Sequence, residues 1–221
     1  MRHLIDFGDL PRAEWDALYK RCSDIIDHPA DYMDACKGKV MASLFYEPST
    51  RTNFSFQTAM LRVGGSVFGF ADPKSTSTAK GETLKDTIKM VSGYADVVVM
   101  RNPREGAAKA ASLYSDVPVI NAGDGGHMHP TQTMADLTTI TRLHGGVDGL
   151  SVGLCGDLKN GRTVHSLIKP WPSSRTSSST SSPLVSWQCP SICGPSCGRT
   201  ACGSWRSPVW RPSCPSWMCS I

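Results

Sequence analysis

Apolar residues between positions 1 and 169 occur alternately in short continuous runs and at helical spacing. The continuous runs are typical of strands buried on both faces, and they cover residues 40–46, 66–70, 95–101, 117–121 and 150–156. Helical spacing predicts helices at residues 15–26, 54–63, 83–94, 105–115 and 130–144, and a further helix that starts near Gly161. The alternation predicts an α/β fold with a parallel sheet flanked by helices.

This pattern stops at Lys169. The remaining 52 residues hold 15 Ser, 8 Pro, 6 Cys and 5 Trp, with no Asp, Glu or Lys. The prolines exclude long helices, and the irregular spacing of apolar residues argues against a packed core. We therefore expect residues 170–221 to be a disordered, low-complexity tail, translated from a shifted reading frame. The predicted domains are a ligand-binding domain at 1–148 and the incomplete start of a second α/β domain at 149–169.

Charge and cysteine content also differ between the two parts. Four of the 23 basic residues lie in the tail, so residues 1–169 carry 19 basic and 19 acidic groups and have no net charge. A neutral body lacks the basic surface that nucleic acids require. Three scattered cysteines in the body are typical of a reducing compartment, and no apolar run has the length of a signal peptide or a membrane span. We expect a cytoplasmic protein that binds neither nucleic acid nor membrane.

Polar groups follow several predicted strands, where ligands bind in parallel sheets. The stretch EPSTRTN (47–53) follows the first strand, and its hydroxyls, arginine and helix start suit a phosphate group or a simple N-terminal helix cap. Arg101 ends a later strand. His129 and Gln132 lie one helical turn apart, as a pair that holds an amide or carbonyl group would. Each residue also fits an ordinary surface or capping role.

Two further segments carry candidate cations. The polar loop STSTAKGE (75–82) contains Lys80 and fits either a functional or a flexible surface loop. Arg162 follows the strand 150–156 and suits a carboxylate, although an ordinary strand-to-helix connection is an alternative. Candidate hydrogen-bond donors outnumber candidate bases, and residues 1–169 show no paired carboxylates or metal-ligand cluster. The pattern favours binding of an anionic substrate and stabilisation of developing charge.

Five stretches occur in an order and at intervals that carry a specific resemblance. They are FYEPSTRTNFSF (45–56), STAKGETLKDT (77–87), VVVMRNPREGA (97–107), INAGDGGHMHPTQ (120–132) and GDLKNGRTVHS (156–166). Residues 1–169 therefore resemble the catalytic chains of the aspartate carbamoyltransferase family. The resemblance implies a carbamoyl-phosphate-binding domain at 1–148. It also implies transfer of the carbamoyl group from carbamoyl phosphate to L-aspartate in pyrimidine synthesis, with no metal or organic cofactor.

The resemblance implies a set of side chains that bind carbamoyl phosphate: Ser49, Thr50, Arg51, Thr52, Arg101, His129 and Gln132. The first four would cradle the phosphate, and Arg101 would contact both phosphate and carbonyl oxygen. His129 would bind the carbonyl oxygen, and Gln132 the carbamoyl amide. Thr52, Arg101 and His129 would also stabilise the charge that develops on the carbonyl oxygen during transfer.

The second substrate and the assembly are implied in the same way. Arg162 would bind a carboxylate of L-aspartate. Lys80 would reach the active site of a neighbouring subunit in a homotrimer, with or without regulatory chains, accompanied by a residue from 75–77 (Ser75, Thr76 or Ser77). Two alternatives remain open: an ornithine carbamoyltransferase-like enzyme, and a non-catalytic domain that binds carbamoyl phosphate or another anion. Because the second domain is incomplete, we expect weak carbamoyl phosphate binding with little turnover.

Overall fold

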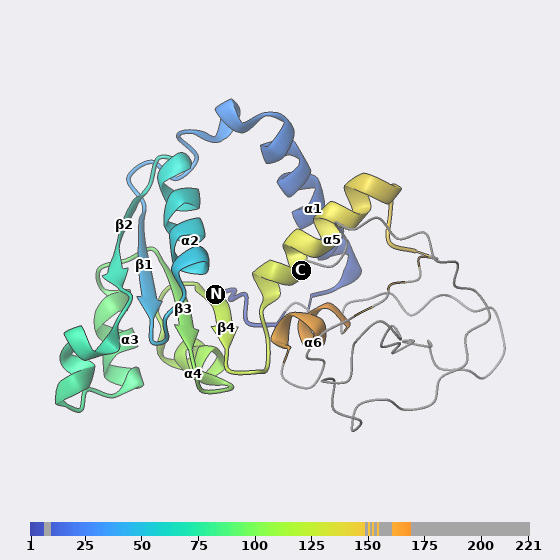
Figure 1. Ribbon diagram of the computed structural model, residues 1–221. Coiled ribbons are helices and arrows are strands. Elements are labelled where there is room, and N and C mark those ends of the chain that lie inside the picture. The colour runs from blue at the N-terminus through green and yellow to red at the C-terminus, as the bar shows by residue number, and fades with distance from the viewer. Residues whose placement is uncertain (7–9, 149, 151, 153, 155–160, 169–221) are drawn as a thin grey trace, which may run out of the picture. The chain divides into compact units, whose positions relative to one another are not determined.

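The fold was obtained as a computed structural model that describes residues 1–6, 10–148, 150, 152, 154 and 161–168. The described strands form a parallel sheet in the order β2–β1–β3–β4 (Figure 1). Their bounds in that order are Ser66–Phe70, Val40–Phe45, Val97–Asn102 and Val119–Asp124. The predicted α/β fold is therefore confirmed, and the carboxyl ends of all these strands meet at one edge of the sheet.

Helices connect the strands and lie beside the sheet (Figure 1). The α-helices are α1 (Arg12–Asp27), α2 (Thr50–Arg62), α3 (Leu84–Ser92), α4 (Ala107–Tyr114), α5 (Pro130–His144) and α6 (Arg162–Ile168). Three short 3₁₀ helices accompany them: η2 (Pro29–Tyr32), η3 (Pro73–Ser75) and η4 (Ser77–Lys80). The predicted helix at 130–144 coincides with α5, which starts with a proline at its first position and ends before Gly145 in the left-handed region, at φ +77°.

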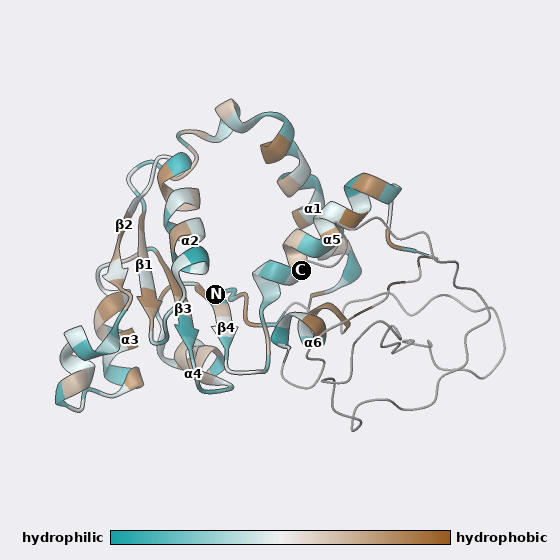
Figure 2. Cartoon of the chain, viewed as in Figure 1, coloured by the Kyte–Doolittle hydropathy of each residue, from teal (hydrophilic) through white to brown (hydrophobic). Residues whose placement is uncertain are grey.

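Side chains on each strand alternate between the two faces of the sheet. On β1, Leu44 packs in a cluster that contains Ile88 of α3, whereas Phe45 packs in a second cluster that contains Met60 of α2. Because helices cover both faces, the strands stay apolar along most of their length. Figure 2 shows a hydrophilic carboxyl end on β3, where Arg101 and Asn102 lie. The fold thus places polar side chains at the strand ends.

Some element boundaries differ from the sequence prediction. α2 begins at Thr50, before the predicted start at residue 54, because its first turn is polar and shows no apolar periodicity. β4 continues to Asp124, past the predicted end at Asn121. A register shift between Met100 and Asn102 of β3 lets the strand keep pairing through a stretch that contains glycine.

Other predictions lie outside the described residues. These are the strand at 150–156, of which isolated positions are described without secondary structure, and the tail at 170–221. By contacts the chain divides into two units, 1–148 with 158–172 and 149–157 with 173–221, and all helices and strands named above belong to the first. The domain boundaries and the shifted reading frame stay predictions. Among the described helices, none combines the length and apolar character needed to cross a membrane.

Candidate active site

Arg101 is the second-to-last residue of β3, and Glu47 lies just past the end of the adjacent strand β1. The parallel register places Phe45 opposite Arg101, and the Tyr46 N–H donates to the Arg101 carbonyl oxygen at 2.8 Å. At this point Arg101 Nε donates to Glu47 Oε1 at 2.5 Å, and only 11% of the Arg101 side chain is exposed. Strand pairing therefore brings together two charged side chains that are 54 residues apart in the sequence.

Arg162, the first residue of α6, binds the same carboxylate. Its Nη1 donates to Glu47 Oε1 at 3.1 Å and to the Gly125 carbonyl oxygen at 2.8 Å. Gly123 has a φ of +121°, and a Cβ at this position would lie 3.3 Å from Arg162 Nη1, so glycine makes room for the guanidinium. Glu47 therefore holds two guanidinium groups against one carboxylate oxygen and leaves a net positive charge.

The electrostatics of Arg101 follow from this crowding. Burial and the nearby Arg162 lower the pKa of Arg101, while its hydrogen bond to Glu47 opposes the change. An arginine stays protonated at physiological pH in spite of such a shift. The pair is therefore a permanent cationic site at the sheet edge.

His129 is the residue that precedes α5, and it is 7% exposed. Its backbone N–H donates to Ser166 Oγ of α6 at 3.2 Å, and its ring Nδ1 lies 3.4 Å from Thr131 Oγ1. Burial, followed by the charges of Arg162 and Arg101, lowers the pKa of His129 to about 4. The imidazole is therefore neutral at pH 7, so it can donate one hydrogen bond to an oxygen without adding a third positive charge.

A cleft of about 260 Å³ lies between α2 and the start of α5. Its lining combines hydroxyl, imidazole and carboxamide groups with apolar side chains from the two helices: Thr52, Ser55, Phe56, Ala59, His129, Thr131, Gln132 and Ala135. Three predicted site residues, Thr52, His129 and Gln132, thus share one cleft. Thr52 also links it to the arginine pair, because Arg101 Nη1 lies 3.5 Å from Thr52 Oγ1.

The start of α2 lies at this cleft with its backbone donors available. Ser49 precedes the helix and makes no side-chain capping bond, and Asn53 N–H is bonded to the Ser49 carbonyl oxygen at 3.0 Å. The N–H groups of the first turn have no helical partner, so they suit an anion. Asn53 anchors this turn to the sheet, because its Oδ1 accepts from Ser43 Oγ of β1 at 2.8 Å and from Gln57 Nε2 at 2.7 Å.

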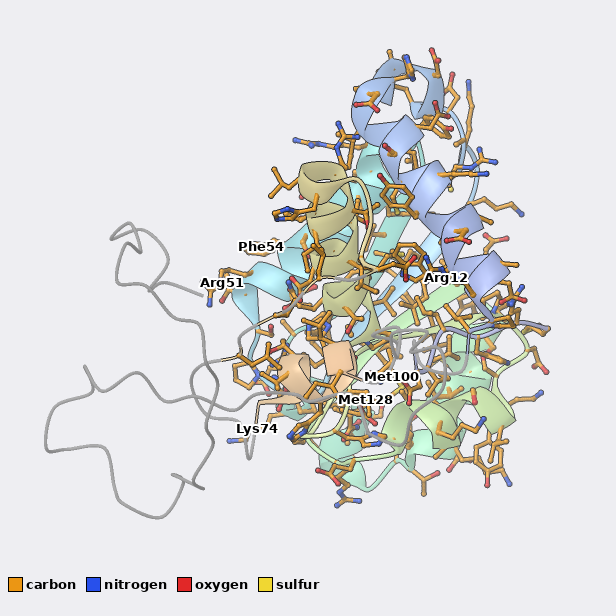
Figure 3. The ribbon with its side chains drawn as sticks, turned by 90° about the vertical axis from the view of Figure 1, so that its right-hand side faces the viewer. Arg12, Arg51, Phe54, Lys74, Met100 and Met128 are labelled. Atoms are coloured by element: carbon orange, nitrogen blue, oxygen red, sulfur yellow. The ribbon has the colours of Figure 1, made fainter. Side chains whose placement is uncertain are left out.

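Other predicted residues are not brought to this cluster. Arg51 is exposed and projects away from the first turn of α2, as Phe54 does one turn later (Figure 3). Thr50 is exposed, and Ser49 is half-buried. Lys80 is exposed at the end of η4, which follows β2 at one edge of the sheet, whereas His129 follows β4 at the other edge (Figure 1). The loop at 75–77 shares this distant position.

Gln132 lines the cleft, but its amide has a partner within the helix. Its Nε2 donates to Asp136 Oδ1 at 2.9 Å. Burial raises the pKa of Asp136, and the hydrogen bond from Gln132 counteracts this effect. One of the two N–H donors of Gln132 is therefore directed along α5. The carboxamide oxygen and the second N–H can face a ligand.

Sequence reasoning missed two residues of the site. Glu47 lies within the quoted EPSTRTN stretch but received no role, although an acid directly after a buried strand and beside an arginine-bearing strand could have signalled an ion pair. Ser166 is 0% exposed and accepts the His129 N–H, and no feature of the sequence pointed to that contact. Both residues act on groups that were already candidates.

The chemistry of the cluster is that of anion binding. Two guanidinium groups, free helix-start N–H groups, a threonine hydroxyl and a neutral imidazole are all hydrogen-bond donors. Within the described ranges, no three His, Cys, Asp or Glu side chains are grouped so that they could hold a metal ion. The arrangement can bind a phosphate or carboxylate and stabilise negative charge on a nearby oxygen.

Comparisons with known proteins identify similar chains. Residues 2–142 match the model of the aspartate/ornithine carbamoyltransferase carbamoyl-P binding domain. Aspartate carbamoyltransferase catalytic subunits are similar over 168 residues, at 60% identity in Clostridium acetobutylicum and 58% in Clostridium perfringens; in both cases the match covers 76% of this chain and 55% of the relative. The chain therefore spans about half the length of these curated relatives.

Solved structures show the same likeness. The aspartate transcarbamoylase from Trypanosoma cruzi, in complex with carbamoyl aspartate and phosphate, is 41% identical with a TM-score of 0.73, over 77% of this chain and 53% of that one. The catalytic subunit of the M. jannaschii aspartate transcarbamoylase is 50% identical with a TM-score of 0.71, over 77% and 56% respectively. Similarity of this degree extends beyond the fold to the sequence.

Proposed function

The chain belongs to the aspartate/ornithine carbamoyltransferase family, and on that premise we propose that its described residues bind carbamoyl phosphate for transfer of the carbamoyl group to L-aspartate. The observation that carries the proposal is the meeting of Arg101, Arg162, Thr52 and His129 around the strand ends. The net positive charge there suits a phosphate dianion. A neutral imidazole beside it suits an uncharged carbonyl oxygen.

In the proposed reaction, the amine nitrogen of L-aspartate forms a bond to the carbamoyl carbon, and the bond from that carbon to the phosphate oxygen breaks. Negative charge develops on the carbonyl oxygen, where Thr52, Arg101 and His129 supply hydrogen bonds. The amine proton leaves with the phosphate, so no side chain has to act as a base. The donors at the start of α2, with Ser49 as its preceding residue, hold the leaving phosphate.

The choice of L-aspartate over L-ornithine rests on the relatives. Curated chains at 55–60% identity are named aspartate carbamoyltransferase catalytic subunits. In its proposed role, Arg162 contacts a carboxylate of L-aspartate, and in one such arrangement the substrate carboxylate exchanges with Glu47 Oε1 at Nη1. Both partners are carboxylates, so the exchange conserves the type of interaction.

Calorimetry of the 221-residue chain with carbamoyl phosphate tests the binding step. Arg101→Gln should weaken binding by about tenfold to a hundredfold, because a charge-assisted bond is lost. Arg104→Gln is the matched control, since Arg104 is exposed on the loop after the same strand and should leave affinity unchanged. Equal effects of both substitutions, or failure of wild-type protein to bind carbamoyl phosphate, would contradict the assignment.

The transfer step has a separate assay. Because the second domain is incomplete, carbamoyl aspartate should form only slowly from carbamoyl phosphate and L-aspartate, and substitution of L-ornithine should give no product. Chromatographic detection of the carbamoylated amino acid distinguishes the two acceptors. Binding without product would instead assign this chain to the non-catalytic alternative.

We further propose a homotrimer in which Lys80 acts at the site of a neighbouring copy. The support is that Lys80 lies at the β2 edge, away from His129, and that an exposed surface on α2 carries apolar side chains. Phe54 is 61% exposed and Leu61 is 59% exposed, two turns apart on one helix. Leu61→Asp should therefore dissociate the assembly in light scattering, while Leu113→Asp, at an exposed position of α4, should not. If the wild-type chain is monomeric in light scattering, Lys80 cannot act at the site of a neighbouring copy.

The proposed setting is the cytoplasm. Cys22 and Cys36 are half-buried free thiols in the described part of the chain, and thiols of this kind persist in reducing compartments. Fractionation of cells that express the chain, with detection of the full-length protein, tests this assignment.

A further inference from the structure

We propose that Asp124 is a positioning residue, which fixes the loop that carries His129 against the loop that follows Arg101. Asp124 is the last residue of β4, and it is 1% exposed. It lies outside the set of residues that would touch the substrate. Of the measurements that test this inference, only ligand affinity depends on the proposed function.

The Asp124 carboxylate is surrounded by hydrogen-bond donors. Its Oδ1 accepts from Asn121 Nδ2 at 3.0 Å and from the Met128 N–H at 3.1 Å. Its Oδ2 accepts from the Gly106 N–H at 2.9 Å, and His127 Nδ1 lies 3.4 Å from the same atom. Burial of a carboxylate is unfavourable unless donors of this number and geometry replace water.

These donors come from two loops that serve the site. Met128 directly precedes His129, and the Asp124 N–H also donates to the Met128 carbonyl oxygen at 3.3 Å, which closes the loop between them. Gly106 belongs to the loop after β3, the strand that carries Arg101. One carboxylate therefore ties the chain after Arg101 to the chain before His129.

Both oxygens of Asp124 are needed as acceptors in this arrangement. Asparagine would keep one acceptor for Asn121 and the Met128 N–H, but its amide nitrogen would face the Gly106 N–H, so two donors would oppose each other. Asp124→Asn is almost equal in size to the native residue. It therefore separates the hydrogen-bonding role of the carboxylate from packing.

The charges that face His129 come from other elements. Arg101 on β3 and Arg162 on α6 lower its pKa, and Glu47, which follows β1, binds both arginines. Thr131 Oγ1 is the neutral partner of its Nδ1, and Ser166 Oγ accepts from its backbone N–H. Asp124 thus fixes the position of the imidazole. Release of the loop would expose His129 to water and bring its pKa back toward the ordinary value near 6.5.

The test is an NMR titration of the imidazole signals in the full chain, with His129 assigned by comparison with His129→Gln. In Asp124→Asn the His129 midpoint should rise by at least about one pH unit toward the unperturbed value. Carbamoyl phosphate affinity, measured well below the melting temperature, should fall by about tenfold to a hundredfold, because small misplacements of a binding group have effects of this size. Asp116→Asn removes an exposed carboxylate paired with Lys89 and should change neither value.

The outcomes separate the possible failures. An unchanged His129 midpoint in folded Asp124→Asn overturns the positioning role, even if the melting temperature falls. Absence of carbamoyl phosphate binding in the wild type contradicts the proposed function but leaves the titration valid. If Asp124→Asn does not fold, hydrogen exchange of the wild type decides: the Gly106 and Met128 amides should both be protected, and rapid exchange at either would overturn the inference.

Discussion

The low pKa of His129 makes the stability of the fold depend on pH in a defined direction. The folded pKa is about 4, whereas the value in an unfolded chain is 6.5. Between these values the unfolded state binds a proton that the folded state does not, so stability falls as pH is lowered. At pH 8 both states are neutral at this residue and the effect vanishes. At pH 5 the difference in protonation destabilises the folded protein by about 2 kcal/mol.

Denaturant unfolding of wild type and His129→Gln at pH 8, 7, 6 and 5 measures this contribution. As the pH falls, the free energy of unfolding should decrease more steeply for the wild type than for His129→Gln. From pH 8 to pH 5 the wild type should lose about 2 kcal/mol more than the variant. Glutamine is chosen because it is polar but does not titrate. Leu143→Gln, at the exposed far end of the same helix, removes no titrating group and should keep the pH dependence of the wild type. Parallel curves for wild type and His129→Gln would refute the reasoning.

Three further substitutions test how the site is held. Glu47→Gln leaves the guanidinium groups of Arg101 and Arg162 without a charged partner in a partly buried place, and it should reduce the free energy of unfolding by about 1–3 kcal/mol in denaturant titrations. Asn53→Ala removes the acceptor that anchors the start of α2 and should reduce the free energy of unfolding by about 1–3 kcal/mol. Ile88→Ala opens a cavity under α3, where the side chain is 0% exposed. It should reduce the free energy of unfolding by about 2–5 kcal/mol and so lower the melting temperature.

Exposed residues of similar polarity serve as controls for these three substitutions. Glu105→Gln, Ser55→Ala and Leu113→Ala should each change the free energy of unfolding by less than about 0.5 kcal/mol. A loss at a control site as large as that at its partner would mean that the named contact does not account for the effect.

Much of the fold could be predicted because its signals are local. The runs at 40–46 and 95–101 are apolar because helices cover both faces of the strands they form, and a short stretch of sequence records that condition. The helix at 130–144 could be placed to the residue because Pro130 and Gly145 mark its ends. The first turn of α2 could not, because residues that bind at a helix start are polar and leave no apolar period.

Only the tertiary structure decided which distant segments are in contact. The sequence identified Arg101, His129 and Arg162 as candidates one at a time. It did not show that Glu47 joins Arg101 across 54 residues and Arg162 across 115, or that burial beside both arginines keeps His129 neutral. Nor did it show that Lys80 lies at the opposite edge of the sheet from His129. Strand order and register set these distances, and both depend on the packing of the whole sheet rather than on any one stretch of residues.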